Sequence, residues 1–168
     1  MRLMEQGNGR QSMNAQQAQS MILLARGSLG IPFQRYGRDM KKSLDCIGLI
    51  TMAAKPQGIE CPIFNSASRY DPRGRPVYDA IIRDLQRINP NEARAGDILI
   101  FHIVSPGHPL IEHTALISGT NPLTIIHATS YPIPEVIEHR LDAPLVEGMP
   151  TTWRFFVKGA FRFKETSS

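Results

Sequence analysis

The sequence predicts an α+β domain in which helices come first and an antiparallel sheet follows. Up to about residue 90 the apolar side chains recur at helical spacing, whereas from residue 98 short runs rich in β-branched and aromatic residues alternate with Pro, Gly and Asn. Helices followed by a run of strands are typical of α+β architecture. The chain has 168 residues, which is enough for one domain with a hydrophobic core.

The expected domain follows a polar N-terminal segment. Residues 1–15 are rich in Gln, Asn and Gly and show no apolar periodicity, so we expect a flexible tail there and a single domain over residues 16–168. A first helix is predicted over residues 16–29, because AQSMILLARGSL is apolar and Gly30 followed by Pro32 ends it. An irregular loop is expected from there to residue 45.

A second, short helix is predicted to start at Cys46. Its apolar residues fall at the spacing i, i+3, i+4 and i+7 of one helix face, namely Cys46, Leu49, Ile50 and Ala53. Ser43 or Asp45 is placed to cap its N-terminus, and Pro56 with Gly58 closes it.

The middle of the chain is expected to contain an irregular excursion and then a third helix. Residues 56–75 are rich in Pro, Gly and Arg, which is typical of a solvated loop. Pro76 opens a helical pattern that continues to residue 88, and Asn89 with Pro90 stops it. Five strands are then predicted, over residues 98–104, 111–118, 124–130, 135–141 and 153–163.

Composition excludes several classes of protein. Apolar residues make up 42% and charged residues 20%, and the net charge of +4 is spread along the chain, which argues against a nucleic-acid binder. No run of about 18 apolar residues is present, so no membrane insertion is expected, and the N-terminus lacks the apolar core of a secretory signal peptide. No glycine-rich phosphate loop occurs, and we expect no cofactor.

A metal site and a glycosidase pair are also not expected. His102, His108 and His113 have the spacing H-x5-H-x4-H, which crosses a Pro-Gly turn and offers no helical i, i+4 pair of ligands. Glu135 and Glu138 have no second carboxylate placed for glycoside hydrolysis.

Cys46 is the first candidate for chemistry. A thiol in the first turn of a helix lies beside backbone N–H groups and the positive end of the helix dipole, which favours the thiolate. The same N–H groups are suited to stabilising an oxyanion. The alternative is a buried structural cysteine, since Cys46 shares its predicted face with Leu49 and Ile50. The other cysteine, Cys61, precedes Pro62 in the irregular excursion and has no such context.

Two histidines are candidates for a general base and its partner. His113 alternates with Ile111 and Ala115 in its predicted strand, so a polar ring lies among apolar neighbours and needs a partner. His127 in the next predicted strand is placed to face it across an antiparallel ladder. The pattern predicts Cys46 as nucleophile, His113 as general base and His127 as the residue that orients His113. The alternative is that each histidine is a core residue bonded to a backbone carbonyl.

Four motifs resemble one known family. The stretches ARGSLGIPFQRYGRDMKKSLDCIGLI, AGDILIF, IEHTALIS and IIHATS, in this order, are similar to the NlpC-type cell-wall peptidases, a papain-like group of cysteine peptidases. The ending EVIEHRLDAP and WRFFVKGAFRF resembles the branch encoded among tail genes of phages, prophages and gene transfer agents. The family's Asp-Cys pair, strand histidine and following polar residue correspond to Asp45, Cys46, His113 and His127 here.

The resemblance implies a papain-like fold, with the nucleophile helix on a central antiparallel sheet, and hydrolysis of peptide bonds in peptidoglycan stem peptides or cross-bridges. Two positions depart from the family pattern. Phe33 stands after Pro32 where many members have Tyr near the substrate amine, and Ile47 stands where Ser often follows the nucleophile. Asp45 and Phe33 are therefore weak candidates for substrate contacts, and Asp45 is the better candidate for a helix cap.

These expectations combine into one leading hypothesis and two alternatives. The leading hypothesis is a peptidoglycan peptidase made in the host cytoplasm and carried in a phage-like virion tail tip, where it opens the cell wall locally beside tail or hub proteins. The first alternative is a structural tail-hub or assembly protein that keeps the fold with little or no catalysis. The second keeps catalysis but changes the substrate, as in an amidase or a peptidase that matures tail proteins.

Overall fold

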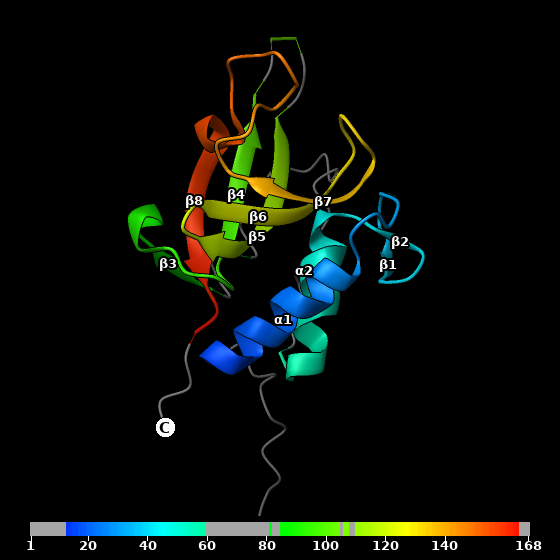
Figure 1. Cartoon of the computed structure of the whole chain (residues 1–168), viewed down its shortest axis with the longest axis vertical. Helices are drawn as coiled ribbons and strands as arrows, with labels where there is room; N and C mark the ends of the chain where they lie inside the picture. The colour runs from blue at the N-terminus through cyan, green and yellow to red at the C-terminus, as the bar shows by residue number, and fades with distance from the viewer. Residues whose placement is uncertain (1–12, 60–80, 82–84, 105, 108–109, 165–168) are drawn as a thin grey trace, which may run out of the picture.

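The structure, a computed structural model, describes residues 13–59, 81, 85–104, 106–107 and 110–164. Two helices, α1 (Ala15–Gly27) and α2 (Cys46–Ala54), lie side by side on one side of a six-stranded antiparallel sheet with the order β3-β8-β4-β5-β6-β7 (Figure 1). The sheet strands are β3 (Gln86–Ile88), β4 (Ile98–Ile103), β5 (Ile111–Thr120), β6 (Leu123–Thr129), β7 (Glu135–Arg140) and β8 (Val157–Arg162). The predicted α+β class with an antiparallel sheet is confirmed.

Short elements complete the described chain. The two-stranded hairpin of β1 (Arg38–Asp39) and β2 (Ser43–Leu44) lies in the segment that was expected to be an irregular loop. Three 3-10 turns are present: η1 (Lys55–Gln57), η2 (Pro90–Glu92) and η3 (Trp153–Phe156). No helix among the described residues is long and apolar enough to cross a membrane.

The first helix forms where the sequence predicts it. Asn14 caps α1 through a capping box, in which its side chain accepts from the Gln17 N–H while the Gln17 side chain accepts from the Asn14 N–H. Met13, just before the cap, is already buried, and its N–H donates to the Lys164 carbonyl next to β8. The packed part of the chain therefore includes Met13 and Asn14, which the sequence placed in the tail.

Two of the predicted elements are wrong at one end. Residues 86–88, predicted as the end of the third helix, form β3 and pair with β8, because Arg87 lies opposite Phe161 in the ladder and cross-strand pairing outweighs helical spacing. Residues 153–156, predicted as the start of the last strand, form η3 instead, and this turn buries Trp153 against the sheet. The loop over 60–75, with Cys61, and His108 lie outside the described residues.

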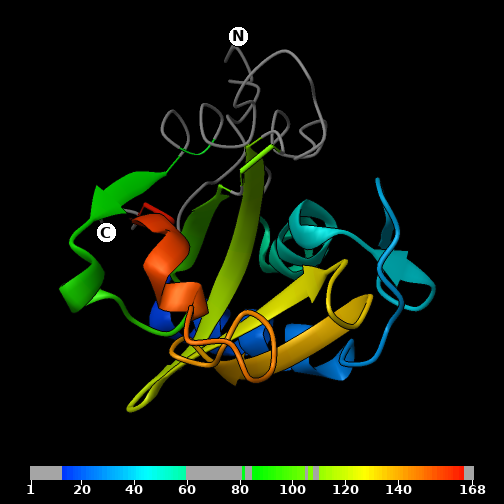
Figure 2. The same cartoon turned by 90° about the horizontal axis from the view of Figure 1, so that it is seen from above.

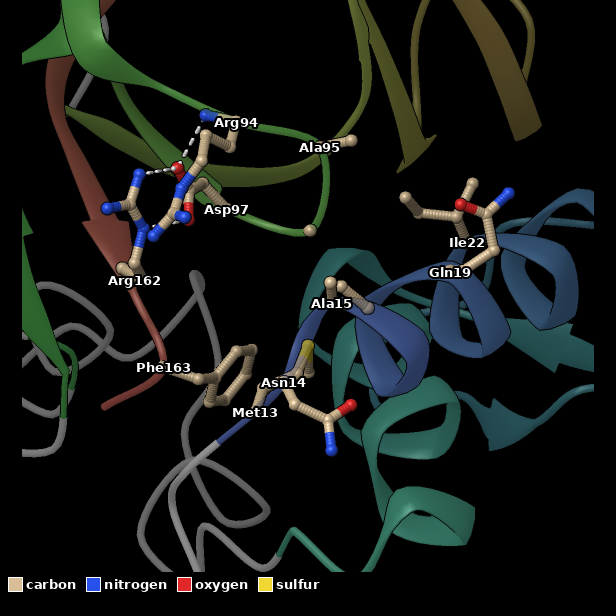
Figure 3. A pocket seen from close by; sticks show the side chains of 12 residues that line it. Met13, Asn14, Ala15, Gln19, Ile22, Arg94, Ala95, Asp97, Arg162 and Phe163 are labelled. Carbon is tan, nitrogen blue, oxygen red and sulfur yellow. Dashed lines mark hydrogen bonds and ion pairs between the residues drawn. The ribbon is translucent and has the colours of Figure 1, made fainter. Parts of the chain in front are cut away.

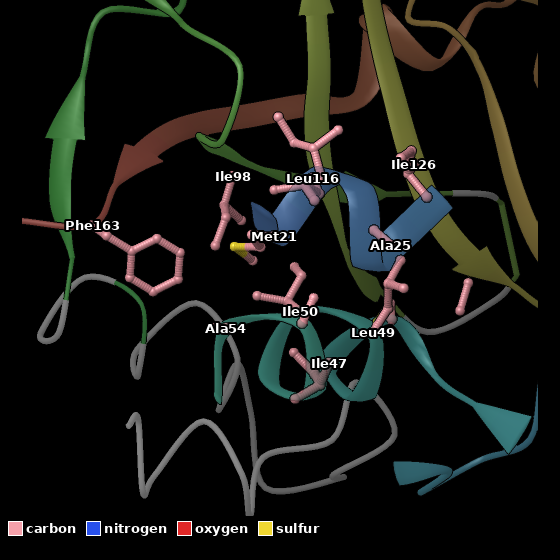
Figure 4. Packing of buried hydrophobic residues seen from close by; sticks show 14 of the residues in the cluster. Met21, Ala25, Ile47, Leu49, Ile50, Ala54, Ile98, Leu116, Ile126 and Phe163 are labelled. Carbon is pink, nitrogen blue, oxygen red and sulfur yellow. The ribbon is translucent and has the colours of Figure 1, made fainter. Parts of the chain in front are cut away.

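The sheet separates two apolar clusters. The cluster on the helix side contains Cys46 together with alternate residues of β4 to β6, among them Ile98, Leu116 and Ile126 (Figure 4). The cluster on the other side contains the intervening residues and Trp153; its members from the same strands are Leu99, Phe101, Ala115, Ile117 and Ile125. Both faces are thus buried, as expected for a central sheet with near-continuous apolar strands.

Candidate active site

Cys46 is the first residue of α2, and it lies against β5. Asp45, the N-cap, accepts a hydrogen bond from the Gly48 N–H at 2.7 Å, which confirms the predicted capping. The Thr114 hydroxyl donates to the Cys46 carbonyl at 3.2 Å, and Thr114 directly follows His113. The predicted nucleophile therefore lies next to the strand that carries the predicted base.

The charge of Asp45 is balanced by the hairpin that precedes α2. Asp45 is 1% exposed; its Oδ1 also accepts from Arg38 at 2.6 Å, and its Oδ2 accepts from the Tyr36 N–H at 2.9 Å. Tyr36 has φ of 64°, a left-handed conformation that turns its N–H toward the carboxylate. These contacts give Asp45 a structural role at the start of α2, and the guanidinium offsets its negative charge beside Cys46.

Close backbone contact holds the same hairpin against α2. A Cβ at Gly48 would overlap the carbonyl oxygen of Gly37, so only glycine lets the two backbones approach as they do.

Phe33 precedes this hairpin in the chain. Its N–H donates to the Pro134 carbonyl at 2.7 Å, and its partly buried side chain packs against the helix-side cluster.

The strands β5 and β6 separate beside the start of α2. Their ladder runs from Thr120–Leu123 to Leu116–Ile126 and stops there, although both strands are fully described and continue further. The helix α2 contacts both strands and lies where they diverge (Figure 2). His113 and His127 both lie past the last pair of this ladder, and the residue after His113 contacts the first residue of α2.

The two predicted histidines face each other as the sequence predicts. His113 Nε2 lies 2.6 Å from His127 Nδ1, with ring centroids 4.9 Å apart, and both residues are fully buried. The prediction that these rings are bonded to each other is confirmed, whereas their catalytic roles stay predictions.

His139 of β7 is the third ring of the cluster, and it is not among the site residues predicted from the sequence. Its Nε2 lies 2.7 Å from His127 Nε2, and its Nδ1 lies 2.8 Å from the Arg140 carbonyl oxygen. Burial lowers the pKa of His139 below its ordinary value of 6.5, and the hydrogen bond to the Arg140 carbonyl offsets this in part. Period-2 alternation is the signal that could have found it, since His139 alternates with the buried Leu141 in the strand sequence EVIEHRL.

Trp153 covers the histidine cluster from the side opposite to α1 and α2. Its ring centroid lies 5.6 Å from that of His113, 4.6 Å from that of His127 and 5.8 Å from that of His139. The ring of Phe101 packs against both His113 and Trp153. Water is thus excluded from His113 and His127, which strengthens the hydrogen bond between them.

All three predicted catalytic residues are closed off from solvent, since Cys46 is 1% exposed and His113 and His127 are 0% exposed. Another histidine, His102 of β4, lies 3.6 Å from the buried Glu112 carboxylate, measured from Nε2 to Oε2. Among the described residues no group of His, Cys, Asp and Glu is arranged to hold a metal ion.

A cavity of about 280 Å³ lies elsewhere, between the start of α1 and the end of β8 (Figure 3). Arg162 forms two hydrogen bonds with Asp97 on its wall, at 2.9 and 2.8 Å. None of the predicted site residues lines this cavity.

Solved structures that share the fold include the following three. An NLP/P60 family protein from Staphylococcus aureus, similar to lipoprotein, matches 95% of this chain with a TM-score of 0.63 and 23% identity. An NlpC/P60 family protein from Bacillus cereus matches 87% of this chain with a TM-score of 0.61 and 21% identity. The NlpC/p60 domain of the peptidoglycan hydrolase SagA matches 86% with a TM-score of 0.52 and 19% identity.

The coverage of these structures is uneven. The match takes in 45% of the S. aureus protein and 40% of the B. cereus protein, so this chain spans less than half of their length, but it takes in 97% of the SagA domain. No protein-family sequence model matches this chain, and no curated protein sequence matches it. The shared architecture confirms the predicted NlpC-type papain-like fold.

Proposed function

We propose that this protein is a cysteine peptidase that hydrolyses peptide bonds of peptidoglycan, with Cys46 as nucleophile, His113 as general base and His127 as the residue that orients His113. The observation that carries the proposal is the 2.6 Å hydrogen bond between His113 and His127. His113 lies on β5, and the next residue of that strand, Thr114, contacts the Cys46 carbonyl. A nucleophile at a helix start, a base and a partner for the base are the parts that thiol catalysis needs.

The proposed reaction proceeds through an acyl-enzyme. The Cys46 thiol gives its proton to His113, and the thiolate attacks the carbonyl carbon of the scissile peptide bond. The C–N bond then breaks as the His113 imidazolium returns the proton to the leaving amine, which leaves a thioester on Cys46. Water adds to the thioester with His113 again as base, and the products are a carboxylate and the free thiol. N–H groups at the start of α2 stabilise the oxyanion.

The fold and the resemblance together support the proposed substrate class. The SagA domain that shares this fold belongs to a peptidoglycan hydrolase. The motifs around Cys46, His113 and His127 resemble those of cell-wall peptidases, so stem peptides of peptidoglycan are the substrate that we propose. The resemblance of the C-terminal strands further supports the proposal that the protein acts in a phage-like tail beside tail or hub proteins, and mass spectrometry of purified particles tests this location.

The central experiment is digestion of purified peptidoglycan, with mass spectrometry of the released peptides. The unmodified chain is expected to release stem-peptide fragments, and both Cys46→Ala and Cys46→Ser are expected to abolish release. Cys61→Ser is the matched control, because it removes the other thiol and is expected to leave release unchanged. Equal release by Cys46→Ala would refute the proposal.

Burial of Cys46 favours a second candidate, a structural tail or assembly protein with the peptidase fold. A thiol that is 1% exposed within an apolar cluster has the environment of an inert core cysteine. Alkylation with iodoacetamide near neutral pH separates the candidates. In the native protein, an activated thiolate at Cys46 reacts faster than the free amino acid cysteine does in solution. A core thiol reacts only when the protein unfolds.

A further inference from the structure

We propose that His139 is a positioning residue which, together with the Arg140 carbonyl, sets the tautomers of His127 and His113 so that His113 presents an unprotonated Nδ1. The inference deepens the proposed function and rests on it, because there His113 acts as the base. His139 lies on β7, two strands away from β5, and the proposed reaction gives it no role of its own.

Three hydrogen bonds connect these groups in one line. His113 Nε2 lies 2.6 Å from His127 Nδ1, and His127 Nε2 lies 2.7 Å from His139 Nε2. His139 Nδ1 then meets the Arg140 carbonyl oxygen at 2.8 Å. Every ring nitrogen of the line except His113 Nδ1 is therefore engaged in one of these three bonds.

The carbonyl oxygen determines the direction of donation along the line. A carbonyl only accepts, so His139 Nδ1 carries the proton of the last bond. In a neutral imidazole the second nitrogen is then an acceptor, so His139 Nε2 accepts from the His127 Nε2–H. By the same step His127 Nδ1 accepts from the His113 Nε2–H. The remaining nitrogen, His113 Nδ1, carries a lone pair, which is the form that a general base requires.

This direction of donation requires that the rings of His127 and His139 are neutral, and their surroundings favour the neutral form. An additional proton on His127 would place an N–H at Nδ1 and force His113 to accept at Nε2, which reverses the tautomer of His113. His127 is fully buried, and Trp153 packs against the rings of both His127 and His139. Burial also lowers the pKa of His139, which keeps its ring neutral near pH 7.

Removing the acceptor at position 139 is therefore expected to scramble the tautomers. Without it, His127 gains nothing from keeping its proton on Nε2 and can move it to Nδ1, facing His113. A fraction of His113 then carries its proton on Nδ1, where it cannot act as a base. Phenylalanine at 139 fills the space without an acceptor, whereas glutamine offers an amide oxygen to His127 and an amide N–H to the Arg140 carbonyl.

Nitrogen-15 NMR of the histidine rings tests the inference without any measurement of activity. In the full chain carrying Cys46→Ala, near pH 7.5, we expect the Nε2–H tautomer for His113 and His127 and the Nδ1–H tautomer for His139. In His139→Phe a substantial fraction of His113 is expected in the Nδ1–H form, and His139→Gln is expected to restore the original tautomer. Arg140→Ala is the matched control, because it keeps the backbone carbonyl and is expected to change nothing.

The kinetic arm uses the active chain with the same three variants. His139→Phe is expected to lower kcat for peptide release about fivefold or more with KM unchanged, because only the fraction with the correct tautomer reacts. His139→Gln and Arg140→Ala are expected to remain within about twofold of the unmodified protein. A purely structural role would instead lower activity in step with the folded fraction, which circular dichroism measures in parallel.

Two results would overturn the inference: a His139 ring that carries its proton on Nε2 in the otherwise unmodified chain, or a His113 tautomer that does not respond to His139→Phe. The first needs no substitution at 139, so it decides the matter even if His139→Phe fails to fold. If the tautomers are as expected but the unmodified chain releases no peptide, the proposed function has failed and the tautomer setting stands.

Discussion

The Trp153 ring lies edge to face against His127, with centroids 4.6 Å apart and an angle of 87° between the rings. The turn η3 positions this tryptophan immediately before β8, on the side of the sheet that α1 and α2 leave uncovered. One aromatic ring therefore shields His127, the middle of three hydrogen-bonded histidines, from water. It also contacts the other two, His113 and His139.

Truncation of this ring is expected to destabilise the fold strongly. Trp153→Ala leaves a large cavity beside His127, and we expect the free energy of unfolding to fall by about 3–5 kcal/mol. Trp153→Phe keeps an aromatic ring and is expected to cost less than Trp153→Ala. Urea denaturation followed by far-UV circular dichroism measures both. Equal losses for the two variants would show that the aromatic contact is not what stabilises the cluster.

The Asp45 carboxylate is expected to stabilise the start of α2 through both its cap and its ion pair. Asp45→Ala removes the acceptor for Gly48 and Tyr36 and the partner of Arg38, so we expect a loss of about 2–4 kcal/mol in the free energy of unfolding. Asp45→Asn keeps a side-chain acceptor and is expected to lose less. Arg140→Ala, which breaks an exposed ion pair with Asp142, is the control and is expected to leave the free energy of unfolding nearly unchanged.

Gly48→Ala is expected to destabilise the protein although alanine is the better helix former. Helix propensity alone would favour alanine by about 1 kcal/mol, but its Cβ would overlap the Gly37 carbonyl oxygen. We expect a net loss of about 1–3 kcal/mol, because backbone must move to relieve the overlap. Gly27→Ala at the end of α1 is the matched control: a Cβ there meets nothing within 4 Å, and stability should hold or rise. A stabilising Gly48→Ala would contradict the close approach.

His139 is expected to make stability depend on pH in the weakly acidic range. Its folded-state pKa is lowered by burial, so as the pH falls through 6.5 the unfolded chain takes up a proton that the folded chain resists. The free energy of unfolding should therefore decrease from about pH 7 to about pH 5, by a fraction of the roughly 1.4 kcal/mol per pH unit that one proton allows. Urea denaturation at several pH values should show a shallower decrease for His139→Gln. Identical pH profiles would contradict this assignment.

Much of the fold could be predicted from local patterns. The helical spacing around Cys46, the capping position of Asp45 and the strands of β-branched residues were visible because each depends on neighbours in the sequence. The errors at residues 86–88 and 153–156 arose where a partner distant in the sequence decided the outcome. Ile88 joins a strand because β8 lies beside it, and Trp153 turns inward because the histidine cluster offers it a buried surface.

At the candidate site, strand alternation along the chain is enough to predict that His113 and His127 occupy neighbouring strands with their rings on one face. Two features could not be predicted in this way: β5 and β6 separate beside the start of α2, and β7 places His139 Nε2 2.7 Å from His127 Nε2. Strand alternation is a local property of the backbone, whereas the register between strands and the place where a ladder stops depend on packing against Trp153 and α2. The series of hydrogen bonds through the three rings ends at the backbone carbonyl of Arg140. No pattern of side chains in the sequence reveals this contact.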